Sequence, residues 1–109
     1  MMTDDAVTII APRPGFDWTD AERAEIGRLE KICNASKNWL LECSYTDAGD
    51  PWCIIYDHDQ QSIILHIARI DRQYVIVWPR EQRSETSPIM TVAIEIALEG
   101  LKLYQRCAR

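Results

Sequence analysis

The stretch that decides the fold runs from Gly49 to Pro79 and reads GDPWCIIYDHDQQSIILHIARIDRQYVIVWP. Three apolar runs within it, at residues 52–56, 62–69 and 74–78, have the length and the β-branched and aromatic residues that are typical of strands. Short polar segments, at 57–61 and around 71–72, separate these runs. Because such short connections join antiparallel neighbours, the stretch predicts an antiparallel meander.

One further strand is expected before the meander. From Trp39 to Tyr45 apolar and polar residues alternate, which is the pattern of a strand with one face in solvent. The turn-forming segment TDAGDP, at 46–51, connects this strand to the next one. Pro79 ends the last strand, and the polar segment REQRSET, at 80–86, is expected to form a solvated loop. The predicted sheet therefore has four strands.

A helix is expected on each side of the sheet. Thr19 and Glu22 have the spacing of a capping box, and an apolar stripe at helical spacing then continues to Cys33. Ser87 is expected to cap the second helix, with Pro88 at its first position. Apolar residues surround nearly the whole of the second helix, so we expect a second subunit or another partner to cover part of it.

These elements define an α+β fold in the order helix, four-stranded antiparallel meander, helix. Such an order predicts a two-layer sandwich with both helices on one face of the sheet. A single α+β domain is expected over residues 17–109, because a chain of 109 residues that is 47% hydrophobic suits one core. Residues 1–16 are expected to form an extended N-terminal arm, since Pro12, Pro14 and Gly15 interrupt regular structure there.

Composition and motifs disfavour several classes of protein. The net charge of −5 argues against a nucleic-acid-binding face and against docking on anionic membranes, because both need a basic surface. No signal peptide or membrane-spanning apolar segment is visible, so we expect a soluble cytoplasmic protein. The motifs of dinucleotide, P-loop and HExxH zinc sites are absent, so we expect no cofactor and no metal, and we favour a protein that is not an enzyme.

The chain contains four cysteines and no Cys-x-x-Cys pair. Their spacing does not match a zinc site, and each of them lies in an apolar context. In a cytoplasmic protein we therefore expect them to be free and to behave as small hydrophobic residues. They are Cys33, Cys43, Cys53 and Cys107.

Five polar or aromatic residues in or beside the predicted strands are candidates for ligand binding: Asp50, Trp52, His66, Arg69 and Asp71. His66 lies inside an apolar strand, where it would be an acid–base group or, as the favoured alternative, a structural histidine. Strand alternation places Arg69 on the face opposite His66. We expect Arg69 to form an ion pair with Asp50 or Asp71, and the less favoured alternative is that it binds an anionic ligand.

Two further patterns have both a structural and a functional interpretation. The run Asp57-His58-Asp59 is either a metal-binding group or a polar turn, and the turn is favoured because the positions that follow do not match a calcium loop. The four tryptophans would either stack on bases or sugars or lie in the core. The core is favoured, because burying Trp removes a large apolar area from water.

Several of these residues belong to one longer pattern. GDPW at 49–52 is followed by HxARxDxxY at 66–74, after a helix that opens with DWT at 17–19. The pattern resembles that of a group of uncharacterised proteobacterial proteins, and the similarity covers residues 17–78. It departs from that group at Cys53, where the group has an aromatic residue, and at Arg72, where it has glycine. The resemblance implies a bacterial protein and marks the five candidate residues for testing, and it implies no activity.

Three functions are compatible with the sequence. The favoured one is a small non-enzymatic interaction or regulatory domain that self-associates as a homodimer, or docks a protein partner, through the helix at 88–104. The second is a sensing or enzymatic domain that binds a small anionic ligand in a pocket around His66, Arg69 and Asp50. The third and weakest is single-stranded nucleic-acid binding through tryptophan and arginine.

Overall fold

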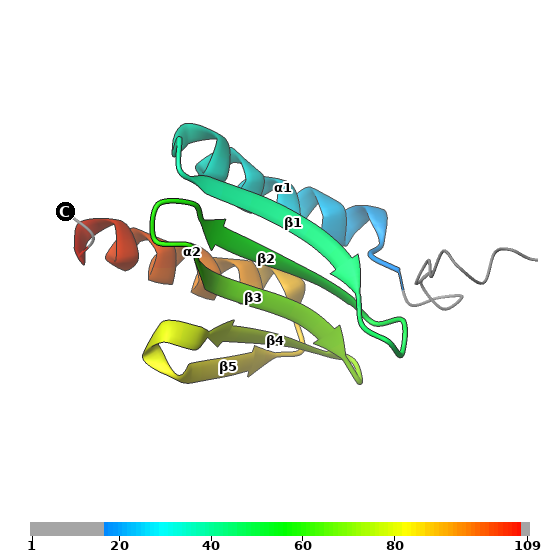
Figure 1. Ribbon diagram of the computed structural model, residues 1–109. Helices are drawn as coiled ribbons and strands as arrows, with labels where there is room; N and C mark the ends of the chain where they lie inside the picture. Colours follow the sequence, from blue (N-terminus) through cyan, green and yellow to red (C-terminus); the bar gives the residue numbers. More distant parts are fainter. Residues whose placement is uncertain (1–16, 108–109) are drawn as a thin grey trace, which may run out of the picture.

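The computed structural model describes residues 17–107, with side chains for residues 17–104, so the predicted N-terminal arm at 1–16 lies outside the described residues (Figure 1). The elements are α1 (Asp20–Ala35), β1 (Trp39–Tyr45), β2 (Pro51–Asp57), β3 (Ser62–Ile70), β4 (Gln73–Trp78), the 3-10 helix η2 (Pro79–Glu81), β5 (Arg83–Ser87) and α2 (Met90–Cys107). The fold is therefore α+β, with one helix before and one after an antiparallel sheet. Neither described helix is long and apolar enough to cross a membrane.

The sheet has five strands in the order β1-β2-β3-β4-β5, and every neighbouring pair is antiparallel. The prediction of four strands was wrong, because the segment expected to be a solvated loop contains η2 and β5. Gln82 follows η2 with a left-handed φ of 52°, and the chain reverses there so that Arg83 pairs with Trp78. β5 reads RSETS and four of its five residues are exposed. Hydrophobic periodicity could not reveal this edge strand, since it contains no apolar residue.

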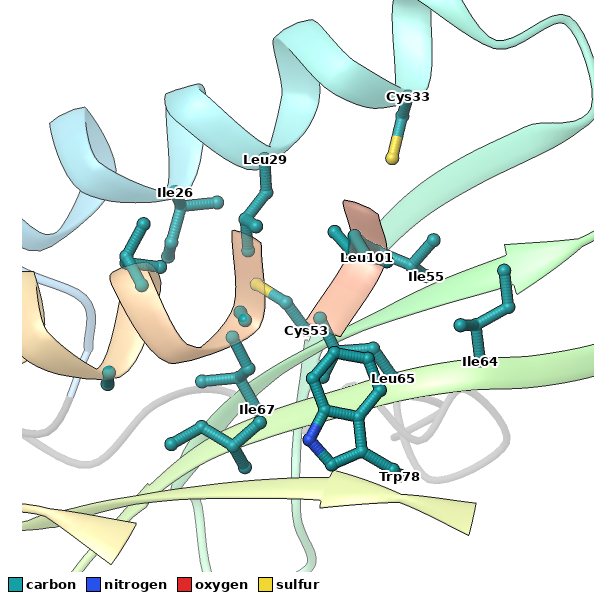
Figure 2. Packing of buried hydrophobic residues seen from close by; sticks show 14 of the residues in the cluster. Ile26, Leu29, Cys33, Cys53, Ile55, Ile64, Leu65, Ile67, Trp78 and Leu101 are labelled. Carbon is teal, nitrogen blue, oxygen red and sulfur yellow. The ribbon is translucent and has the colours of Figure 1, made fainter. Parts of the chain in front are cut away.

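Both helices lie on the same side of the sheet (Figure 1). Side chains alternate between the two faces of each strand, and those on the helix-facing side form the core together with the helices (Figure 2). Neither of the two described helices covers the other face of the sheet (Figure 1). The core includes Ile26, Leu29 and Cys33 of α1, Ile94, Ala97 and Leu101 of α2, and Cys53, Ile55, Leu65, Ile67, Ile76 and Trp78 of the sheet.

The start of α1 is as predicted, whereas α2 starts later than predicted. Thr19 Oγ1 accepts the Glu22 amide at 3.1 Å and Glu22 Oε1 accepts the Thr19 amide at 2.7 Å, so the capping box is confirmed. α2 begins at Met90 and Ser87 is the last residue of β5, but Ser87 Oγ still accepts the Ile89 amide at 3.1 Å just before the helix. Because Ser87 pairs with Tyr74 in the sheet, it is extended and the chain enters the helix only after Pro88.

Trp78 determines how closely α2 approaches the sheet. Its side chain is 1% exposed and lies beneath the helix at Gly100. A Cβ atom at position 100 would overlap the indole ring of Trp78. The contact between α2 and β4 therefore requires a glycine at this position.

Two of the cysteines that were predicted to be free are joined. Cys43 of β1 lies directly opposite Cys53 of β2, with Cα atoms 4.1 Å apart, and the pair forms a disulfide. Their spacing carried a signal, because two strands joined by a turn centred near residue 48 place these positions opposite each other. Cys33 is free and buried as predicted, and burial raises the pKa of its thiol to about 11. The side chain of Cys107 lies outside the described part of the chain.

Candidate functional site

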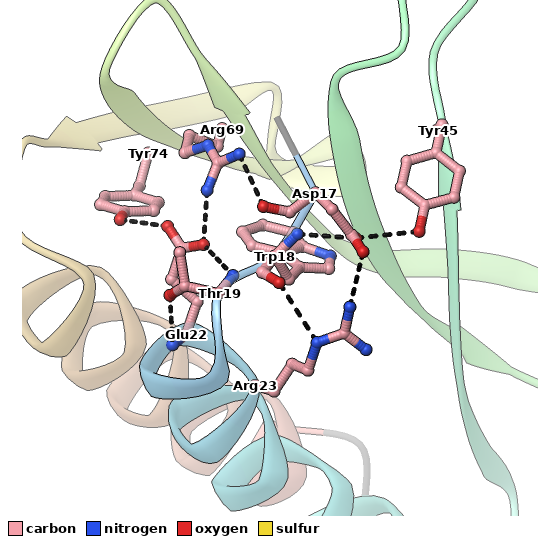
Figure 3. Close-up of polar contacts among 8 residues, drawn as sticks. All are labelled: Asp17, Trp18, Thr19, Glu22, Arg23, Tyr45, Arg69 and Tyr74. Atoms are coloured by element: carbon pink, nitrogen blue, oxygen red, sulfur yellow. Dashed lines mark hydrogen bonds and ion pairs between the residues drawn. The ribbon is translucent and has the colours of Figure 1, made fainter. Parts of the chain in front are cut away.

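Eight residues form a network of polar contacts at the end of the sheet where α1 begins (Figure 3). They come from the segment before α1, from its first turn, and from β1, β3 and β4. We call this network the Glu22 cluster, and its members are Asp17, Trp18, Thr19, Glu22, Arg23, Tyr45, Arg69 and Tyr74. It contains Arg69, one of the five candidate residues.

Glu22 is the centre of the cluster and is 5% exposed. Its carboxylate accepts hydrogen bonds from the Thr19 amide at 2.7 Å, the Arg69 guanidinium at 2.5 Å and the Tyr74 hydroxyl at 2.5 Å. Burial by itself raises the pKa of Glu22, but the bonds from Tyr74, Thr19 and Arg69 favour the charged form and lower the pKa below its usual value. Burial and the bond to Glu22 raise the pKa of Tyr74 to about 12.

Arg69 connects the strand β3 to the start of α1. Its Nη1 pairs with Glu22, and its Nη2 donates to the backbone carbonyl of Asp17 at 2.9 Å. The guanidinium also lies over the ring of Trp18, 5.8 Å from the ring centre. Its side chain is only 14% exposed. Arg69 therefore forms an ion pair, but its partner is Glu22 and not Asp50 or Asp71.

Asp17 extends the cluster to β1. Its carboxylate accepts the Tyr45 hydroxyl at 2.9 Å, the amide of Trp18 at 2.7 Å and the Arg23 guanidinium at 2.7 Å. The bond from Tyr45, with further contributions from Trp18 and Arg23, lowers the pKa of Asp17. The segment that precedes α1 is thus attached to β1 through Asp17 and to β3 through Arg69.

The carboxylates of the Glu22 cluster and the Arg69 guanidinium satisfy one another, whereas the buried indole Nε1 of Trp18 has no hydrogen-bond partner among the described residues. A ligand carboxylate or phosphate could reach Arg69 only by displacing Glu22, which itself is buried and charged. Removing one partner from such a pair leaves an uncompensated buried charge, which costs several kcal/mol, on the order of 3. The arrangement therefore serves to attach α1 to the sheet, and it does not offer Arg69 as an anion clamp.

Asp50 and Asp71 lie in loops at the same end of the sheet. The Asp50 amide donates to Thr46 Oγ1 at 3.0 Å, and its carbonyl accepts the Thr46 amide at 2.8 Å. Asp71 and Arg72 form the tight turn between β3 and β4, with left-handed φ values of 50° and 65°. The predicted pairing of Arg69 with one of these two carboxylates was wrong, because the Arg69 side chain points toward α1 on the helix-facing side (Figure 3).

Trp52 and His66 lie on the face of the sheet that no helix covers, which we call the open face. Trp52 pairs with Ala68 and His66 pairs with Ile54, so the two aromatic rings are diagonal neighbours, with centroids 5.8 Å apart. Arg69 lies on the other side of β3, as strand alternation predicts. The structure thus separates the candidate residues: two on the open face, Arg69 in the Glu22 cluster, and two carboxylates in loops.

Apolar side chains dominate the rest of the open face. Leu40, Ile63 and Ile70 are 52%, 37% and 40% exposed. Burial among such neighbours lowers the pKa of His66. Its imidazole is therefore mainly neutral at pH 7. The other apolar residues of this face are Trp52, Ile54, Tyr56, Ala68, Val75 and Val77.

The Asp57-His58-Asp59 segment is a turn, as the favoured interpretation predicted. Asp57 Oδ1 accepts the amides of Asp59 and Gln60 at 2.9 and 3.2 Å. Among the described residues there is no group of three or more His, Cys, Asp or Glu side chains that could hold a metal ion.

The four tryptophans do not form a stacking surface. Trp18, Trp39 and Trp78 are 7%, 7% and 1% exposed and belong to the core. Trp52 is half-buried and lies on the open face. The core interpretation is thus confirmed for three of the four tryptophans, and base stacking loses its main support.

A groove between α2 and the edge strand β5 was not foreseen from the sequence. It has two hollows, of about 580 and 400 Å³, that share Arg83, Gly100 and Leu103 in their walls. The helix side of the groove is partly apolar, and Val92 and Leu103 are 44% and 55% exposed. The apolar residues around the second helix indicated one wall of the groove in the sequence. The other wall is formed by β5, which has no hydrophobic pattern.

Comparison of the chain with protein-family models, with curated proteins and with solved structures finds no match. The case for a function therefore depends on the surfaces described above.

Proposed function

We propose that this chain is a small non-enzymatic interaction domain that self-associates as a homodimer through α2. The observation that carries the proposal is an apolar stripe on the outer side of this helix and at the residue that precedes it. We call this stripe the α2 flank, and it consists of Ile89, Val92, Ile96 and Leu103. Ile89, Val92 and Leu103 are 56%, 44% and 55% exposed.

The α2 flank faces away from α1. On the side toward α1, Glu95 pairs with Arg28, and Thr91 Oγ1 donates to Glu25 at 3.4 Å. At 100° per residue the flank lies on another side of the helix, beside the groove that β5 borders. Single exposed apolar residues are common, whereas several of them along one side of a helix, beside a groove whose walls also include Glu95 and Glu99, are characteristic of an interaction site.

The candidate residues for chemistry support interaction over catalysis. The ion pair of Arg69 with Glu22 is used to attach α1, and His66 lies on the opposite face of the sheet. An acid–base group and an anion-binding group therefore do not converge on one substrate position, which a catalytic site requires.

The first test measures the solution mass of three proteins by light scattering after size exclusion. Leu103→Glu places a charge in the α2 flank and is expected to convert the dimer to a monomer. Ile70→Glu is the matched control, because Ile70 is 40% exposed on the open face, on the opposite side of the sheet from α2. A monomeric wild-type protein, or a dimer that Ile70→Glu breaks and Leu103→Glu does not, contradicts the proposal.

A second candidate function is the binding of a ligand or partner on the open face around Trp52 and His66. It is favoured by the neighbouring aromatic rings on a face that no helix covers. A thermal-shift screen of anionic and aromatic small molecules on wild type and His66→Ala tests it. A compound that raises the melting temperature of the wild type only supports this candidate function. Equal changes of melting temperature in the wild type and His66→Ala contradict it.

A further inference from the structure

We propose that the two copies of the chain join edge to edge. In this arrangement β5 of one copy pairs antiparallel with β5 of the second copy, so that the two sheets become one continuous sheet. The two α2 flanks then pack against each other above the junction. The inference rests on the proposed function, because it specifies the geometry of that self-association.

β5 offers an open hydrogen-bonding edge. It pairs with β4 on one side and is the last strand of the sheet within residues 17–107, so in this part of the chain its other edge presents backbone amides and carbonyls. Natural edge strands are commonly protected by short length, charged side chains, proline or a bulge. β5 has no proline, lysine or bulge, and the register of its pairing with β4 is regular over all five residues. It does carry two charges, Arg83 and Glu85, so a strand that pairs with it must place opposite charges against them.

The groove indicates what kind of partner fits. An added strand would continue the sheet layer, but it would leave the α2 flank above it uncovered. A second copy supplies both layers at the same relative height, because its own α2 contacts its β4 and β5 in the same way. In a dimer with a twofold axis, the second copy therefore pairs with the strand edge and covers the α2 flank at the same time.

Charge selects one register for this pairing. Residues opposite each other on neighbouring strands share a face, and Arg83 and Glu85 both face the helix side, opposite Trp78 and Ile76. A twofold axis at position 83 would oppose two arginines, and an axis at position 85 would oppose two glutamates. An axis at Ser84 opposes Arg83 of each copy to Glu85 of the other.

The alternative axis at Thr86 is less suitable. It would oppose Glu85 to Ser87, which is 5% exposed, and would leave Arg83 without an opposite residue. Within one chain the contact between Arg83 and Glu85 is 4.0 Å long and its side chains are 49% and 42% exposed. This ion pair is weak, so it costs little to exchange for contacts with a second copy. Arg83 also lies over the ring of Trp78, 5.2 Å from the ring centre, and that contact does not involve Glu85.

The test exchanges these two charges. Arg83→Glu and Glu85→Arg each replace both ion pairs of the dimer by like-charge contacts, and each is expected to weaken dimerisation by about tenfold or more. An equimolar mixture of the two variants is expected to form a heterodimer with wild-type affinity, since every contact then joins opposite charges. Within each variant chain the two charges still repel, so recovery in the mixture reports contacts between chains only.

A cross-linking pair checks the register independently. Ser84 lies opposite itself in the proposed dimer, so Ser84→Cys is expected to form a disulfide-linked dimer under mild oxidation. Thr86→Cys is the matched control on the same face of β5, and it is expected to cross-link no more than the wild type with its native cysteines. Both positions are exposed, and thermal unfolding verifies that each variant is folded.

The outcomes separate this inference from the proposed function. A wild-type dimer with no recovery in the mixture and no cross-link at position 84 overturns edge pairing and leaves self-association intact. A monomeric wild type overturns both.

Discussion

Arg72 occupies a backbone conformation that suits glycine. It follows Asp71 in a tight turn, and both residues have left-handed φ values, 65° and 50° respectively. A side chain in this region costs about 1 kcal/mol. We therefore expect Arg72→Gly to raise the free energy of unfolding by about 1 kcal/mol, as measured in urea. Arg72→Ala is the control, because it removes the same side chain and keeps the Cβ, and an equal gain from it would refute this explanation.

Gly100 is the residue on which the packing of α2 depends. We expect Gly100→Ala to lower stability by about 1–3 kcal/mol, because the new methyl group overlaps Trp78. Gly27→Ala in α1 is the matched control. Nothing lies within 4 Å of a Cβ at that position, so alanine should raise stability by about 1 kcal/mol through helix propensity. If calorimetry shows that Gly100→Ala and Gly27→Ala change the stability in the same direction, the close packing at Gly100 is contradicted.

At the scale of elements, the Glu22 cluster holds α1 against the sheet and makes this attachment dependent on pH. The pKa of Glu22 is lower in the folded protein than its reference value of 4.5. The carboxylate therefore contributes stability above pH 4.5, and this contribution is lost as the pH falls through the folded-state value. We expect Glu22→Gln to be less stable than wild type at pH 7 and the difference to narrow below pH 4.5.

The measurement is the free energy of unfolding from pH 7 down to the acid transition. Glu30→Gln serves as the control, since Glu30 is an exposed residue of the same helix. A constant difference between wild type and Glu22→Gln across the acid range would mean that the charge of Glu22 is not what attaches α1.

The hairpin of β1 and β2 contains the disulfide between Cys43 and Cys53. We expect denatured, unreduced protein to react with two fewer equivalents of a thiol reagent than reduced protein. Cys43→Ala should cost about 2 kcal/mol under oxidising conditions, and reductant should remove the difference from wild type. Equal thiol counts before and after reduction would mean that the pair is not oxidised. Because disulfides persist mainly in oxidising compartments, this count also tests the expectation of a cytoplasmic protein.

The elements differ in how well the sequence predicts them. α1 has a capping box and a regular stripe, and the strands from Trp39 to Trp78 have alternation and turn residues, so local chemistry defines them. β5 has no such pattern, because both its faces are largely in solvent and only the backbone pairing with β4 makes it a strand. Ser87 and Pro88 have the chemistry of a helix start, and strand pairing overrides it.

At the scale of the whole molecule, the candidate residues were recognised individually but not their arrangement. Alternation along β3 was enough to separate His66 from Arg69. The partner of Arg69 could not be predicted, because Glu22 is 47 residues away in sequence and is brought there by the packing of α1. The groove could not be predicted from the sequence either, because it forms only where β5 and α2 meet in the folded chain.

The measurement that tests the account most directly is the mass of the wild-type protein in solution over a wide range of concentrations. We expect a reversible equilibrium whose larger species has twice the monomer mass of 12.6 kDa. A mass that stays at 12.6 kDa up to the highest concentration reached would contradict self-association through α2, and the edge-to-edge dimer with it.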